Sequence, residues 1–193
     1  MVNTEADKAR FLEICNTHIS RNGFEDLLEW LEKSDFYIAP ASTKYHLSEK
    51  GGLLRHSLNV YDEMKRLCST YSHAVRVSEE SIAIMALLHD LCKVNFYKPD
   101  TRNVKKDGVW TSVPVYTIEE KFCYGGHGSK SVFLAERFIE LTPEEAIAIN
   151  CHMGAWDGNK DVSNAYQHCT PAFLLHIADE IATYITENES NIS

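Results

Sequence analysis

A histidine and an aspartate stand side by side at the end of an apolar run, in Ile84-Met-Ala-Leu-Leu-His-Asp-Leu-Cys-Lys93. Two such neighbours cannot both face the same core, and a bare carboxylate in apolar surroundings is destabilising unless it is paired or bound to a metal. Further residues of the same types recur along the chain at His56, His127, His152 and Asp179. Imidazole nitrogens and carboxylate oxygens together form a ligand set for divalent transition metals.

The order of these residues resembles the signature of the HD-domain metal-dependent phosphohydrolases, which runs His, then His-Asp, then Asp. The segments Gly51–Val60 and Leu174–Asp179 resemble the first and last motifs of that family. His127 and His152 stand where some branches, such as bacterial 3′→5′ exoribonucleases and HD phosphodiesterases, carry extra histidine ligands. The resemblance covers roughly residues 40–185 and rests on five segments in the right order.

The resemblance implies two divalent metal ions, which the sequence does not identify among Mn, Fe, Co, Ni, Mg and Zn. The first site would be formed by His56, His89, Asp90 and Asp179. The second site would be formed by Asp90, His127 and His152. Asp90 suits a bridging role because a carboxylate has two oxygens. In the alternative interpretation, His127 contacts phosphate or belongs to a loop, and His152 is structural.

The segment that carries Asp179 supports this assignment without the resemblance. Residues 172–185 are apolar almost all round, which is typical of a buried helix. His176 and Asp179 are three residues apart and share one face of that helix. A metal would compensate the charge of a buried aspartate, and a structural salt bridge is the alternative.

Three cationic residues are candidates for binding a phosphorylated substrate. Lys93 follows Asp90 by three residues and can face the same cleft, although a helix C-terminus also favours a lysine. Lys130 follows a glycine-rich turn at a predicted helix start, where amides and a cation suit phosphate, unless the glycines only make a tight loop. Arg55 could contact substrate or lie in solvent. We therefore predict Asp90, Lys93 and Lys130 as catalytic residues, and Arg55, Lys93 and Lys130 as substrate-binding residues.

Composition narrows the class of protein. With 193 residues and 44% apolar content, the chain predicts one compact domain. No apolar run approaches the roughly 18 residues that a membrane span needs. The acidic N-terminus is unlike a signal peptide, and six scattered cysteines without a C-x-x-C pattern suit a reducing compartment. We therefore expect a soluble cytoplasmic protein without a membrane partner.

Periodicity and capping signals predict an all-α fold, an HD-domain helical bundle with one inserted β-hairpin. We predict a single domain over residues 1–193, with its core at about 40–185 and N-terminal helices within 5–33. The predicted helices cover 5–20, 24–33, 53–71 and 79–91, with further helices beginning near 142 and 170. Thr4 and Asp7 are the expected cap of the first helix. An Asp-Gly turn between β-prone flanks predicts the hairpin within 95–118, either over the site or over the core.

The predicted function is metal-dependent hydrolysis of a phosphoester in a small nucleotide-type substrate by a metal-activated water. A net charge of -9 disfavours long nucleic acids as partners. Trp110, Tyr116 and Phe122 could stack on a base or simply pack. The alternatives are a 3′→5′ exonuclease or cyclic-(di)nucleotide phosphodiesterase, a non-hydrolytic nucleotide-binding regulatory module, and an interaction domain with a structural metal.

Overall fold

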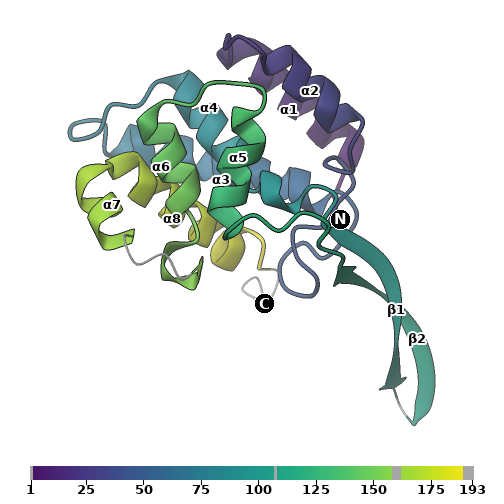
Figure 1. The fold of residues 1–193 in the computed structure, drawn as a ribbon. Coiled ribbons are helices and arrows are strands. Elements are labelled where there is room, and N and C mark those ends of the chain that lie inside the picture. Colours follow the sequence, from purple (N-terminus) through teal and green to yellow (C-terminus); the bar gives the residue numbers. More distant parts are fainter. Residues whose placement is uncertain (1, 107, 158–161, 189–193) are drawn as a thin grey trace.

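The structure is a computed structural model that describes residues 2–106, 108–157 and 162–188. Within these residues the fold is a helical body with one two-stranded antiparallel sheet, which confirms the predicted all-α class with an inserted hairpin (Figure 1). The α-helices are α1 (Thr4–His18), α2 (Phe24–Glu32), α3 (Gly52–Thr70), α4 (Glu79–Leu88), α5 (His127–Glu136), α6 (Pro143–Cys151), α7 (Val162–His168) and α8 (Thr170–Ile181). Two 3-10 turns, η1 (Leu91–Lys93) and η2 (Gly154–Asp157), and a π-helical turn, η3 (Ala182–Thr186), complete the body.

Helix α3 packs against α1, α4 and α8, and α6 packs against α5 and α8. Buried side chains at Leu54, Leu58, Tyr61 and Met64 recur every three or four residues on α3 and form its apolar face. In α4, residues 82–88 are all buried, so this helix is enclosed on every side beyond its first turn. The last residues of α4 therefore lead the chain directly into the core.

The helix ends near the predicted ligands differ from the sequence-based boundaries. Helix α4 ends at Leu88 rather than near residue 91, and His89 is its C-cap. Asp90 leaves the helical region with φ -105° and ψ 22°, and η1 follows it. Helix α6 likewise ends before His152, which is its C-cap. Both histidines thus stand at helix ends, where the backbone changes direction and the side chains are not confined to one helical face.

The hairpin consists of β1 (Tyr97–Lys106) and β2 (Val109–Ile118), paired from Tyr97↔Ile118 to Lys106↔Val109. Gly108 has φ +84° at the turn, a conformation that favours glycine. The other predicted turn residue, Asp107, lies outside the described residues. Most positions of both strands are exposed, and Figure 1 shows the hairpin extending away from the helical body. Along most of their described length the strands therefore cover neither the site nor the core.

Two further expectations need correction. The predicted cap of α1 by Thr4 and Asp7 is wrong, because the Asn3 side chain accepts the hydrogen bond from the Ala6 amide at 3.3 Å. Asp7 is instead buried against α3. Helix α7 was not predicted, since its short sequence has no strong apolar period.

Among the described residues, no helix combines the length and the apolar character that crossing a membrane requires.

A buried ion pair joins the N-terminal helices to the body. Glu145 of α6 is fully buried, and its carboxylate accepts hydrogen bonds from Arg21 at 2.7 and 3.1 Å. The same carboxylate accepts the Thr142 amide in a capping box. Glu80 of α4 also pairs with Arg21 at 3.2 Å. One guanidinium therefore links the α1–α2 connection to two helices of the body.

We expect Arg21→Ala to lower the free energy of unfolding by about 3 kcal/mol, because it leaves the Glu145 carboxylate buried without its cation. Arg66→Ala is the matched control, since Arg66 pairs with Glu63 at the surface and should contribute less than about 1 kcal/mol. Urea denaturation of both variants measures the difference. Equal losses would show that the buried pair has no special role.

Candidate metal centre

Two buried histidines have their ring orientation fixed by backbone carbonyls. Nδ1 of His89 lies 2.8 Å from the Ala86 carbonyl oxygen, and Nδ1 of His152 lies 2.7 Å from the Ile149 carbonyl oxygen. A carbonyl can only accept, so Nδ1 carries the proton in both rings. In the neutral ring, Nε2 therefore keeps its lone pair, which is the form of imidazole that binds metals.

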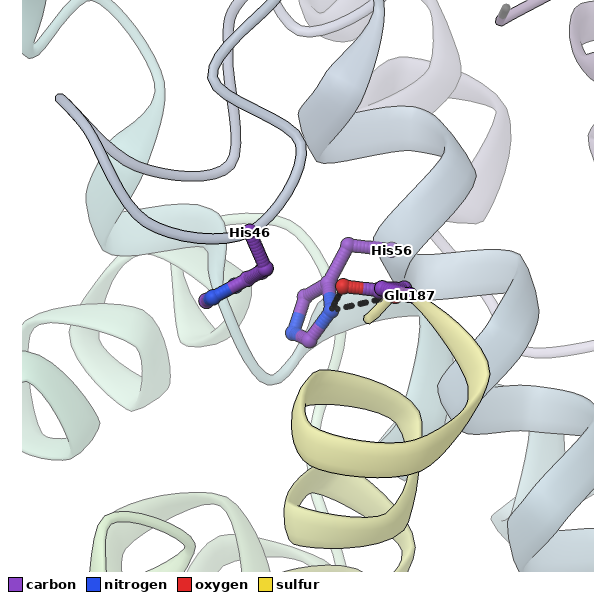
Figure 2. A group of neighbouring side chains, drawn as sticks. All are labelled: His46, His56 and Glu187. Carbon is purple, nitrogen blue, oxygen red and sulfur yellow. Dashed lines mark hydrogen bonds and ion pairs between the residues drawn. The ribbon is translucent and has the colours of Figure 1, made fainter. Parts of the chain in front are cut away.

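The third buried histidine, His56 of α3, is oriented by a carboxylate. Its Nδ1 lies 3.0 Å from Oε1 of Glu187, and the Asn59 side-chain amide donates to the same oxygen at 2.9 Å. On the other side of the ring, Nε2 lies 3.1 Å from Oδ1 of Asp179. Burial by itself would lower the pKa of His56, but Glu187 and Asp179 overcome it and raise this pKa to about 10. Figure 2 shows Glu187 and His46 beside the His56 ring.

Asp90 lies where the three imidazoles meet. Its Oδ2 is 3.4 Å from Nε2 of His89 and 3.5 Å from Nε2 of His56, and its Oδ1 is 3.6 Å from Nε2 of His152. Lys93 Nζ is 2.6 Å from Oδ2. Burial would raise the pKa of Asp90, but the charges of Lys93 and His89 hold it well below its usual value. Oδ2 of this carboxylate therefore faces His56 and His89, and Oδ1 faces His152.

Among the described residues, three groups place their ligand atoms within 4.8 Å of one another and could hold a metal ion. They are His56 with His89 and Asp179, His89 with Asp90 and His152, and His46 with His56 and Glu187. Nε2 of His152 is buried and has no hydrogen-bond partner within the described part of the chain. A cation beside Asp90 would satisfy this nitrogen, so the residues fit a divalent metal.

The structure brings together five of the six predicted ligands, which are His56, His89, Asp90, His152 and Asp179. They come from α3, the end of α4, the end of α6 and α8. The sixth, His127, is the first residue of α5, and its ring centroid is 6.4 Å from that of Phe96. None of the three groups found among the described residues includes His127.

Of the three predicted substrate-binding residues, one lies at the cluster. Lys93 lines the cleft beside Asp90. Arg55 Nη2 is 2.6 Å from Asp7 of α1, and Lys130 Nζ is 2.9 Å from Glu120. Neither Arg55 nor Lys130 lines that cleft in the described structure. Their substrate contacts remain predictions.

Sequence reasoning missed two residues at the cluster, His46 and Glu187. His46 lies in the irregular segment before α3, and its sequence context predicted no ligand role. Burial lowers its pKa to about 4, so the ring is neutral at pH 7. Glu187 follows Asp179 by eight residues, which is about two helical turns and thus the same face, and this spacing was the available signal. The π-helical turn η3, closed by the Glu187 amide on the Ala182 carbonyl at 2.9 Å, directs the end of the helix toward α3.

A cleft of about 880 Å³ opens beside the cluster. It is lined by Tyr45, His46, Leu47, Ser48, Glu49, Lys93, Met153, Trp156, Asp179, Glu180, Thr183, Tyr184, Glu187 and Asn188. His89, Asp90 and His152 lie beneath this surface and are fully or almost fully buried. Asp179 and Lys93 therefore form the boundary between the buried imidazoles and the space that a substrate could occupy.

Two comparisons with known proteins found similarity to this chain. The model of the HD domain family matches residues 53–184. A dihydroneopterin 2′,3′-cyclic phosphate phosphodiesterase from Methanocaldococcus jannaschii is 26% identical over 153 residues. That match covers 77% of this chain and 53% of the relative, so the chain spans about half the length of the relative. No solved structure matches this chain.

In protein stripped of metal, we expect Glu187→Gln to lower the pKa of His56, because the amide keeps an acceptor but removes the negative charge. Folding raises the pKa of His56 from 6.5 to about 10, and the resulting contribution to stability is fully present below pH 6.5. This contribution is lost as the pH rises through about 10. The variant should therefore lose less stability than the wild type between pH 7 and pH 10.

NMR titration of the histidine rings and urea denaturation across this pH range measure the two effects. Glu180→Gln is the matched control, since it removes a carboxylate from the same segment. An unchanged His56 pKa in Glu187→Gln would show that Glu187 does not govern this ring.

Proposed function

The chain belongs to the HD-domain family, and from this premise we propose that it is a metal-dependent phosphohydrolase. The family and the phosphodiesterase relative both support hydrolase activity in general. The observation that carries the proposal is the convergence of three oriented imidazoles on Asp90. Their Nε2 atoms lie 3.4 to 3.6 Å from its oxygens. Such a set of nitrogen and oxygen donors suits divalent transition metals.

We propose two ions that share Asp90. His56, His89, Asp90 and Asp179 would hold the first, and Asp90 and His152 would contribute to the second, because Nε2 of His89 has one lone pair and binds one ion. Bound divalent ions supply Lewis-acid chemistry, in which they polarise a phosphoryl oxygen and lower the pKa of water. Glu187, Ala86 and Ile149 act through hydrogen bonds to the three rings and hold each Nε2 in place.

Lys93 is the proposed electrostatic residue of the reaction. Its Nζ contacts Asp90 and its side chain lines the cleft, so it can also donate to a phosphoryl oxygen that gains charge. The charge of Asp90 raises the pKa of Lys93 despite its burial, and the ammonium is therefore retained at neutral pH. Asp179 lines the same cleft and would act there as a ligand of the first ion.

We propose that the substrate is a small nucleotide-type phosphodiester. The matching relative is a phosphodiesterase named for a cyclic phosphate of a pterin, and the match includes most of this chain. The cleft volume of about 880 Å³ lies in the range of small-molecule sites. The two alternatives, an exonuclease and a cyclic-dinucleotide phosphodiesterase, can be distinguished from this proposal by a substrate assay.

Metal content tests the ligand assignment. We expect His152→Ala, after reconstitution with Mn²⁺, to hold about half the metal of the wild type, because it removes one ligand of the proposed second site. His127→Ala should retain more, since His127 stands outside the groups. Elemental analysis measures both, with Arg66→Ala as the surface control. Full metal content in His152→Ala would overturn the second site as assigned.

A phosphoester panel tests the substrate class. We expect kcat/KM to be at least about tenfold higher for a 2′,3′-cyclic nucleotide than for a short single-stranded RNA, because the net charge of -9 opposes binding of a long polyanion. Assays at near-physiological salt with Mn²⁺, Mg²⁺, Fe²⁺, Co²⁺ or Ni²⁺ measure the ratio. A preference for RNA of more than about tenfold, roughly 1.4 kcal/mol, would favour the exonuclease.

A further inference from the structure

Three exposed aromatic side chains line the cleft that opens onto the metal centre. Tyr45 is 76% exposed, Trp156 is 80% exposed and Tyr184 is 57% exposed, and all three line the cleft. They come from three separate places, which are the segment before α3, the turn η2 and the turn η3. We call these three residues the aromatic rim.

The rim is unusual because exposed large rings leave apolar surface in contact with water. Single exposed aromatics are ordinary, but here three line one cleft beside polar ligands, a combination that is typical of a small-molecule site. Trp110, which the sequence had suggested for stacking, is 69% exposed on the hairpin and does not line this cleft. The tertiary structure thus brings a different set of rings to the site.

A carboxylate is placed within reach of the same space. Glu180 is half-buried and lines the cleft beside Asp179. Within the described residues, no ion pair or hydrogen bond engages the Glu180 side chain. An ionised carboxylate accepts two parallel hydrogen bonds, so it matches a ring edge that offers two adjacent N–H donors. Guanine offers such an edge through its ring N–H and its amino group.

We propose that the aromatic rim stacks on the planar heterocycle of the substrate and that Glu180 accepts hydrogen bonds from its N–H edge. This proposal rests on the proposed function, because the phosphate of the same molecule would bind at Lys93 and the proposed metal ions. It narrows the substrate class to small phosphodiesters that carry a fused ring with adjacent N–H donors, as in guanine. The rim supplies affinity for any flat ring, and Glu180 supplies the preference between rings.

Binding is tested separately from catalysis by fluorescence. Guanosine has no phosphate, so its contact with the rim does not need the metal centre. We expect guanosine to quench tryptophan fluorescence in the wild type and in Trp110→Phe, and to quench it much less in Trp156→Phe. Quenching that persists in Trp156→Phe, or is absent from the wild type, would overturn the rim as the ring site.

Kinetics test the two roles. We expect Trp156→Ala to lower kcat/KM for guanosine 2′,3′-cyclic phosphate by about tenfold, as loss of one stacked ring does elsewhere. Trp110→Ala is the matched control at the hairpin and should match the wild type. Glu180→Gln should reduce the preference for the guanosine over the cytidine substrate by about tenfold, because the amide offers one acceptor oxygen instead of two.

The outcomes separate this proposal from the proposed function. If the wild type hydrolyses neither cyclic nucleotide but guanosine quenching depends on Trp156, the rim stands and the hydrolase assignment fails. If both substrates are hydrolysed and Trp156→Ala and Glu180→Gln behave like the wild type, the rim fails and the hydrolase assignment stands.

Discussion

The site depends on how the charge of one buried carboxylate is compensated. Asp90 is almost fully buried, and charged groups remain in an interior only when they are paired and hydrogen-bonded. Three imidazole nitrogens and one ammonium surround its two oxygens. Because each of these four groups comes from a different segment, α3, α4, η1 and α6 must meet at this point. The helical packing of the body is therefore tied to the chemistry of the centre.

The ends of helices are what make such a meeting geometrically feasible. A side chain within a regular helix is confined to one face, whereas His89 and His152 follow the last turns of α4 and α6. Their Nδ1 atoms donate to the carbonyls three residues earlier. These carbonyls belong to the last turn of a helix, in which carbonyls lack amide partners within the helix. The same hydrogen bond thus caps the helix and orients the ring. The apolar sequences of both helices carry these ends into the core.

The sequence predicted the helical class, the inserted hairpin and the residue types of the centre, because apolar periodicity and the order of His and Asp are local properties. His56, His89, Asp90, His152 and Asp179 do come together. The helix ends were less accurately predicted, since two or three residues at the end of a helix are decided by contacts rather than by propensity.

The sequence by itself determined which buried polar groups need a partner, namely the carboxylates and imidazoles placed within apolar helices. Only the tertiary structure decided which groups are those partners. Glu187 reaches His56 from 131 residues away through a π-helical turn. His46 borders the cleft from the irregular segment before α3, and Trp156 borders it from the short 3-10 turn η2, and neither segment has a periodicity to interpret. Contacts of this kind depend on the packing of distant elements, so a local pattern can indicate the face of a helix but not the partner that it meets.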